Sequence, residues 1–210
     1  MPSQIRIAAV AALILITITG TGCTWFKANA YEGFGRDRWQ KPDEVIAALK
    51  IEPGDRIADL GSGSGYFTIR LAKAAGPNGK VYAVDIDEKM NERLRKRLWV
   101  AGVQNAEIVL GEFDDPRLPD GEVDLIFTSN TYHHIRDRPT YFRNVQIDLS
   151  AKGRVAIIDY DGRKGWFVKL QGHFTPKEEV LEEMAEAGYE VDEDHTFIDR
   201  QSFIVFRPKP

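Results

Sequence analysis

The fold follows from residues 59–65, which read DLGSGSG. This glycine-rich turn comes after an apolar run, Ile57–Leu60, and before an amphipathic stretch, Tyr66–Ala75, so we expect a strand, a tight turn and a helix. Glycine allows the positive φ angles of a tight turn and lets a ligand approach the backbone closely. The exposed N–H groups at the start of the helix suit an anionic group of that ligand. The stretch therefore predicts a ligand site at the end of a buried strand.

Short apolar runs alternate with amphipathic stretches along most of the chain, which predicts strands joined by crossover helices in a largely parallel sheet. The expected strands are Ile57–Leu60, Val81–Asp85, Ala106–Leu110, Val123–Ser129, Arg154–Asp159, Tyr189–Phe197 and Ser202–Phe206. The expected helices are one that begins at Pro42, then Tyr66–Ala75, Glu88–Val100, Pro139–Leu149 and Pro176–Ala187. Only a short turn separates the last two strands, so we expect them to form an antiparallel hairpin at one edge of the sheet.

A second acidic residue, Asp85, ends the next expected strand, twenty residues beyond Gly65. At that spacing an acid can bind the hydroxyl groups of a ribose. The glycines follow G-x-G-x-G rather than the G-x-G-x-x-G of dinucleotide-binding folds. The carboxylate of Asp59 would also repel a pyrophosphate, but it can face the ammonium group of a methionine moiety. Two alternatives remain, namely a nicotinamide oxidoreductase and an ordinary glycine-rich turn with a capping aspartate.

The motifs between Trp39 and Phe206 resemble those of the class I S-adenosylmethionine-dependent methyltransferases. The matching stretches are Asp59–Gly65, Val84–Asp87, Gly111–Asp114, the strand Asp124–Asn130, and Lys152–Gly153 before the strand Arg154–Asp159, with Ala151 in place of the usual proline. The resemblance implies an α/β fold, a three-layer sandwich around a seven-stranded, mostly parallel sheet of Rossmann-like type with the last strand antiparallel. It also implies S-adenosylmethionine as the cofactor.

The resemblance places the cofactor at the ends of successive strands. It implies that Asp85 holds the ribose and that the adenine lies against Ile86 and Phe113. The expected cofactor-binding residues are Asp59, Gly61, Ser62, Gly63, Gly65, Asp85, Ile86, Glu112, Phe113 and Asn130. Trp39 either closes over the cofactor as part of a lid or fills the edge of the core.

Residues 130–135, NTYHHI, resemble the segment after the fourth strand in small-molecule methyltransferases, including those of quinone biosynthesis. This segment borders the transferred methyl group. His133 or His134 can remove a proton from an acceptor hydroxyl, because imidazole titrates near neutral pH. Alternatively, either histidine packs or caps a helix, and alignment of the acceptor with the methyl group supplies much of the rate. His173, in a later loop, faces either an acceptor pocket or solvent.

The composition of the 210-residue chain is that of an ordinary globular protein, with 43% hydrophobic residues and a formal net charge of −4. The negative charge argues against a broad phosphate-binding surface, so we expect no nucleic-acid partner. The one cysteine, Cys23, excludes an internal disulfide. No Cys/His spacing resembles a zinc site, so we also expect no metal. Neither composition nor motifs indicates an oligomeric state.

The N-terminal segment differs from the rest of the chain. Arg6 precedes an apolar run, Ile7–Thr19, that is too short for a comfortable membrane span and is typical of a secretory signal. Small residues and Cys23 follow, as in a bacterial lipoprotein signal, although Gly20 stands where such signals usually have an aliphatic residue. We expect a signal peptide or membrane anchor in residues 1–24, an irregular linker or lid in residues 25–41, and the methyltransferase domain in residues 42–210.

The expected function is transfer of a methyl group from S-adenosylmethionine to an unidentified small-molecule acceptor. The N-terminal segment predicts a protein that is exported and anchored in the bacterial envelope, with lipidation at Cys23. The alternative is an uncleaved membrane anchor with the domain in the cytoplasm. Export would separate the domain from the cytosol, where S-adenosylmethionine is made. A second possible function is therefore an exported, non-catalytic module of the same fold that binds a nucleoside or acts as a scaffold.

Overall fold

The computed structural model describes residues 35–162 and 173–210. The chain divides into two units, Met1–Arg36 and Asp37–Pro210, and the second unit contains the fold described below. The predicted signal or anchor in residues 1–24 lies outside the described residues. Within the described part of the chain, no helix is both long enough and apolar enough to cross a membrane.

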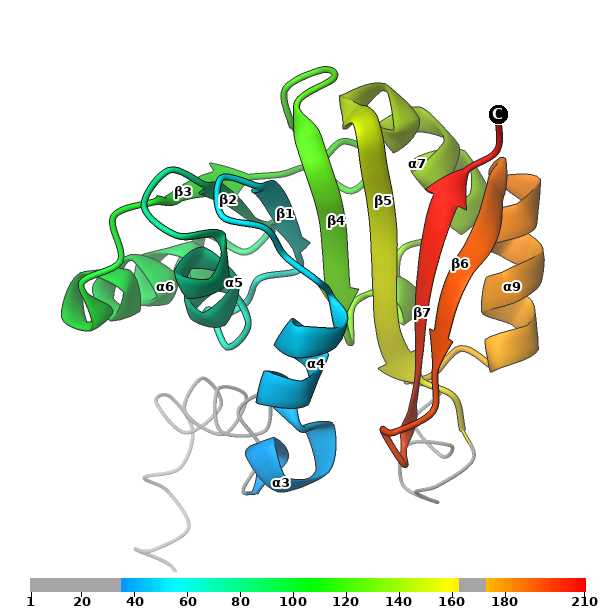
Figure 1. The fold of residues 1–210 in the computed structure, drawn as a ribbon, viewed down its shortest axis with the longest axis horizontal. Helices are drawn as coiled ribbons and strands as arrows, with labels where there is room; N and C mark the ends of the chain where they lie inside the picture. The colour runs from blue at the N-terminus through cyan, green and yellow to red at the C-terminus, as the bar shows by residue number, and fades with distance from the viewer. Residues whose placement is uncertain (1–34, 163–172) are drawn as a thin grey trace, which may run out of the picture. The chain divides into compact units, whose positions relative to one another are not determined.

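A seven-stranded sheet forms the centre of the unit (Figure 1). Its strands are β1 (Arg56–Leu60), β2 (Lys80–Asp85), β3 (Ala106–Leu110), β4 (Val123–Ser129), β5 (Leu149–Tyr160), β6 (Tyr189–His195) and β7 (Gln201–Pro208). They lie in the order β3-β2-β1-β4-β5-β7-β6. The pairings among β1 to β5 are parallel, and β7 runs antiparallel to both β5 and β6. The predicted fold class and the hairpin at one sheet edge are therefore confirmed.

Helices cover both faces of the sheet, which gives three layers (Figure 1). Leu49 and Leu71 bury α4 and α5 against one face, and Leu94 buries α6 against the same face beside β2. Phe142 and Met184 bury α7 and α9 against the other face. The described helices are α3 (Arg36–Gln40), α4 (Pro42–Ala48), α5 (Thr68–Ala75), α6 (Glu88–Ala101), α7 (Arg138–Asn144) and α9 (Lys177–Glu186), with short 3-10 helices η1 (Tyr132–His134) and η2 (Val145–Asp148).

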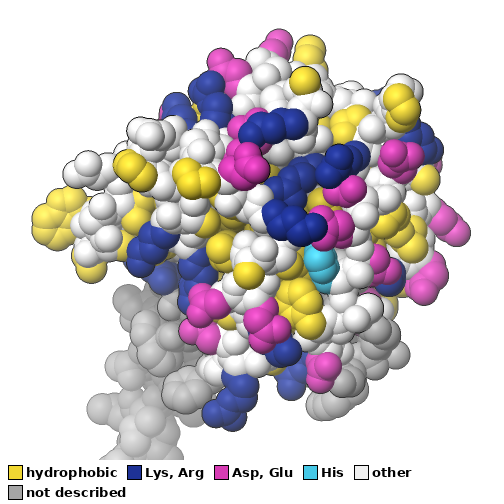
Figure 2. Space-filling view, in the orientation of Figure 1, with side chains coloured by type: hydrophobic (Ala, Val, Ile, Leu, Met, Phe, Trp, Pro, Cys, Tyr) yellow, Lys and Arg dark blue, Asp and Glu magenta, His cyan; other side chains and the backbone are white. Residues whose placement is uncertain are grey.

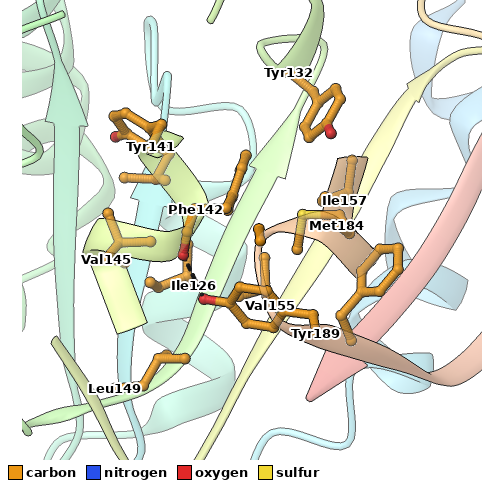
Figure 3. Packing of buried hydrophobic residues seen from close by; sticks show 14 of the residues in the cluster. Ile126, Tyr132, Tyr141, Phe142, Val145, Leu149, Val155, Ile157, Met184 and Tyr189 are labelled. Carbon is orange, nitrogen blue, oxygen red and sulfur yellow. Dashed lines mark hydrogen bonds between the residues drawn. The ribbon is translucent and has the colours of Figure 1, made fainter. Parts of the chain in front are cut away.

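Aromatic residues make up much of the core beneath α7 and α9 (Figure 3). Tyr132 and Phe142 are fully buried and stack with ring centroids 5.4 Å apart. The hydroxyl of Tyr189 donates a hydrogen bond of 2.9 Å to the carbonyl of Phe142, which satisfies a polar group that is costly to bury unpaired. Because Tyr132 is held in this core, the two histidines that follow it are held near the carboxyl end of β4.

Two predicted elements differ from the structure by more than two residues at one end. The helix expected over Pro139–Leu149 ends at Asn144 and continues only as the 3-10 helix η2, and β5 begins at Leu149 rather than at Arg154. Leu149 pairs with Val123 ahead of an irregularity in the ladder, so pairing with β4 draws these residues into the strand. Part of the linker expected to be irregular is helical, because residues 36–40 form α3.

A buried carboxyl group at the end of η2, just before β5, makes the stability of the protein depend on pH. Burial first, and then the negative charges of Asp120 and Asp115, raise the pKa of Asp148 to about 7. The pKa of Asp in an unfolded chain is about 3.9. The folded state therefore prefers the protonated carboxyl, and this stabilisation is present below pH 4 and is lost as the pH rises to about 7.

We expect Asp148→Asn to stabilise the protein increasingly as the pH rises, because the amide cannot ionise. Between pH 4 and pH 8, the free energy of unfolding of the variant relative to the original protein should grow by about 1–2 kcal/mol, after allowance for partial solvent screening. Urea unfolding at the two pH values measures this difference. An advantage of the same size at both pH values would contradict the assignment.

Candidate functional site

The glycine-rich turn lies at the carboxyl end of β1, next to β4. From β1 the chain goes to β2 and β3 on one side of the sheet, and it later returns to β4 on the other side. In open α/β sheets, ligands bind outside the carboxyl ends of the strands at such a reversal of strand order. The predicted cofactor site is therefore at the position that the topology favours for a ligand (Figure 1).

The three glycines of the turn have different surroundings. All have positive φ, at 73° for Gly61, 53° for Gly63 and 88° for Gly65. A Cβ atom on Gly61 would lie 2.0 Å from Oγ1 of Thr131, and one on Gly65 would lie 2.3 Å from Cδ1 of Leu94. A Cβ atom on Gly63 would meet nothing within 4 Å. The outer glycines thus allow close packing, and Gly63 presents open backbone that a ligand can approach.

Asp85 joins the ends of β1 and β2. Its carboxylate accepts a hydrogen bond of 2.8 Å from the backbone N–H of Gly63 and one of 2.9 Å from that of Asp87. Burial raises the pKa of Asp85 above its ordinary value, and the backbone hydrogen bonds oppose this rise. The structure therefore brings together the two motifs from which the sequence predicts a cofactor site. Asp85 is placed beside the open part of the turn, where a ribose is expected.

Asp59 and Ser62 lie on the buried side of the turn. The carboxylate of Asp59 accepts a hydrogen bond of 2.6 Å from the hydroxyl of Thr68, the first residue of α5. Asp59 thus ties the end of β1 to the start of that helix, and its contact with a ligand ammonium stays a prediction. The hydroxyl of Ser62 is buried and makes no hydrogen bond to another described residue. A polar ligand group in the turn would satisfy it.

Two exposed apolar side chains follow the neighbouring strands β2 and β3. Ile86 is 49% exposed and Phe113 is 69% exposed, and the guanidinium of Arg136 lies 5.6 Å from the Phe113 ring centroid. An apolar ring bound between these strand ends would cover surface that is unfavourable to leave in water. Glu112, another of the expected cofactor-binding residues, forms an ion pair with Arg117.

A buried amide network lies at the carboxyl end of β4. Asn130 has a φ of 60°, and its side-chain oxygen accepts a hydrogen bond from the amide of Gln201. Gln40, at the end of α3, donates hydrogen bonds of 3.0 Å to the hydroxyl of Ser129 and to the side-chain oxygen of Gln201. The sequence missed Gln40 and Gln201, because a single buried amide in a helix or strand leaves no periodic pattern. Trp39, the predicted lid residue, lies 5.8 Å from the ring of Tyr160.

The two candidate catalytic histidines follow the carboxyl end of β4. They come just after Thr131, which packs against Gly61 of the glycine-rich turn. Nδ1 of His133 lies 2.7 Å from the buried carboxylate of Asp159, and its backbone N–H donates a hydrogen bond of 2.9 Å to the same carboxylate. Burial, and then His133 and His173, lower the pKa of His134, which favours its neutral form. The sequence did not predict the pairing of Asp159 with His133, because the two residues belong to different strand ends.

Paired charges hold the segment that carries these histidines. Arg138 forms ion pairs with Glu179 at 2.5 Å and with Glu183 at 2.7 Å, and Glu183 also accepts a hydrogen bond of 2.8 Å from the hydroxyl of Tyr132. The ion pairs join α7 to α9, and the hydrogen bond of Tyr132 joins η1 to α9. Figure 2 shows Lys and Arg side chains close to Asp and Glu side chains over the visible face.

Comparison with known proteins assigns the chain to a family. Residues 51–201 match the family model described as a methyltransferase domain, which is more than half of the chain. The chain belongs to the methyltransferase-domain family. This membership confirms the predicted class I S-adenosylmethionine-dependent methyltransferase domain and S-adenosylmethionine as its cofactor.

Several similar proteins are methyltransferases by name. A solved S-adenosylmethionine-dependent methyltransferase from Aquifex aeolicus has the same fold, with a TM-score of 0.80, 23% identity, and coverage of 86% of this chain and 96% of that chain. An arsenite methyltransferase from Halobacterium salinarum is 30% identical over 54% of this chain and 29% of its own length. A demethylmenaquinone methyltransferase from Lactobacillus johnsonii is 29% identical over 63% of this chain and 54% of its own length. This methyltransferase domain thus matches only part of these two curated relatives.

Proposed function

We propose that the protein transfers the methyl group of S-adenosylmethionine to a small-molecule acceptor. One observation carries the proposal: Asp85 and the open backbone of Gly63 meet at the end of β1, through a hydrogen bond of 2.8 Å. This arrangement offers a carboxylate to the ribose hydroxyls and, at Gly63, backbone that a ligand can approach. The exposed side chains of Ile86 and Phe113 provide an apolar surface for the adenine.

The residues of this chain would bind and align the reactants. S-adenosylmethionine supplies a methyl group on a positively charged sulfur, so a bond from the acceptor to the methyl carbon can form as the sulfur–methyl bond breaks. Nδ1 of His133 faces Asp159, and a carboxylate accepts hydrogen bonds, so in the neutral form of the ring Nδ1 carries the hydrogen and Nε2 has the lone pair. Nε2 can then take the proton that an acceptor hydroxyl loses.

A small acceptor agrees with the named relatives. They include methyltransferases of arsenite and of demethylmenaquinone, two acceptors of different chemistry. Loop residues determine the shape of an acceptor pocket, so likeness of the domain supports a small molecule and does not choose between these classes. From the negative net charge we still predict that the protein does not bind nucleic acid.

Calorimetry of the purified protein with S-adenosylmethionine tests the cofactor site, and a metabolite screen for the product S-adenosylhomocysteine tests the reaction. We expect one S-adenosylmethionine molecule to bind per chain, and we expect S-adenosylhomocysteine to form with at least one of the metabolite mixtures screened as acceptors. Binding without any product would favour the non-catalytic module. Binding of a nicotinamide nucleotide in place of S-adenosylmethionine would overturn the proposal.

The exported and membrane-anchored location is a separate proposal, supported by residues 1–24 of the sequence alone. Lipid labelling of intact cells tests the anchor. Label that persists in Cys23→Ser would contradict lipidation at this cysteine, and a domain that proteases cannot reach from outside would favour the cytoplasmic alternative.

A further inference from the structure

Three of the four histidines of the chain lie together beside the proposed methyl-transfer position. His133 and His134 come from η1, and His173 comes from the segment before α9. One ring nitrogen of each lies within 4.8 Å of those of the other two. The ring centroids are 4.1 Å apart for His133 and His134, and 5.5 Å and 5.4 Å from these two to His173. The arrangement gathers three imidazoles from two separate segments at one point.

The innermost histidine is fixed by a buried acid. The side chains of His133 and Asp159 are only 6% and 0% exposed, and Nδ1 of the ring lies 2.7 Å from the carboxylate. Histidines that bind metals almost always donate their second ring N–H to a carboxylate or carbonyl group, which fixes the tautomer and turns the other nitrogen toward the ion. Asp159 also adds a negative charge that would partly balance a cation.

We propose that His133, His134 and His173 bind one divalent transition-metal ion of the zinc class. Imidazole nitrogens bind zinc at about 2.0–2.1 Å in a tetrahedral arrangement, which places them about 3.3 Å from one another. The three nitrogens therefore need to approach by no more than about 1.5 Å. The residues His134 and His173 are exposed, so their rings can rotate toward the fixed ring of His133.

Three protein ligands leave a fourth tetrahedral position open, as in catalytic rather than structural zinc sites. An oxygen or sulfur atom of a small ligand can occupy such a position. The inference goes beyond the proposed methyl transfer and replaces one part of it, because a metal ion on Nε2 of His133 would occupy the lone pair that a general base needs. It also differs from the prediction of no metal. The sequence did not indicate this site, because His173 lies far from the other two histidines along the chain and the three have no recognisable spacing.

Zinc titration of the full chain, after treatment with a chelator, tests the site by calorimetry. We expect one zinc ion per chain, and we expect His134→Ala and His173→Ala each to weaken its affinity by about tenfold or more. Both residues are exposed, so their loss should change the stability of the metal-free protein little. Urea unfolding in the presence of the chelator checks this point.

The fourth histidine provides a matched control. His195 lies in β6 outside the cluster, so His195→Gln should keep the zinc affinity of the original protein. The proposal is overturned by absence of zinc binding, by unchanged affinity in the two alanine variants, or by an equal loss in the His195 variant. Binding of S-adenosylmethionine is measured on the same preparations, so failure of the metal site can be told from failure of the cofactor site.

Discussion

Gly61→Ala should lower the free energy of unfolding by about 3–5 kcal/mol, the largest loss expected for any single methyl group added to the turn. The new Cβ atom would lie 2.0 Å from Oγ1, 2.5 Å from Cγ2 and 2.7 Å from Cβ of Thr131. Rotation of the threonine side chain can relieve the first two clashes but not the third, because Cβ is fixed to the backbone. The φ of 73° adds a further cost of about 1–2 kcal/mol for any residue with a side chain.

The other glycines of the turn supply the controls for this prediction. Gly63→Ala has a similar positive φ and no clash, so it should cost only about 1–2 kcal/mol. Gly65→Ala should lie between the two, because its new methyl group meets the flexible end of Leu94. Urea unfolding of the three variants should therefore rank Gly61→Ala as the least stable. Equal stabilities for Gly61→Ala and Gly63→Ala would show that the turn does not pack against Thr131.

The sheet could be predicted from the sequence because its signal is local. Short, mainly apolar runs between turns predict strands, and Ala106–Leu110 and Val123–Ser129 were predicted with the bounds that the structure has. The glycine-rich turn and Asp85 were predicted for a similar reason, since a turn between a strand and a helix has a recognisable pattern. Where pairing with a neighbour decides the state, as at Leu149 in β5, the local pattern was insufficient.

The acceptor side of the site could not be predicted to the same extent. His133 was a candidate from its sequence context, but its partner Asp159 belongs to another strand end, and His173 belongs to a later loop. The pair of buried amides, Gln40 and Gln201, is 161 residues apart in the sequence and meets only in the folded chain. Contacts of this kind depend on how the ends of β4, β5 and β7 lie side by side, which no pattern within one segment encodes.

Asp85→Asn should weaken the binding of S-adenosylmethionine by about 10- to 100-fold, because hydrogen bonds to a charged group contribute about 1.5–3 kcal/mol. The amide keeps one oxygen that can accept from the N–H of Gly63, but its NH2 group can accept neither from the N–H of Asp87 nor from a ribose hydroxyl. Calorimetry gives the affinity, and urea unfolding shows whether the turn still folds. Glu107→Gln is the matched control. Among the described residues, this exposed carboxylate on β3 forms an ion pair only with Lys80, at 2.6 Å. The control variant should therefore bind S-adenosylmethionine with the original affinity. If Asp85→Asn binds as tightly as the original protein, the junction of Asp85 with Gly63 serves the fold alone, and the cofactor must be held elsewhere.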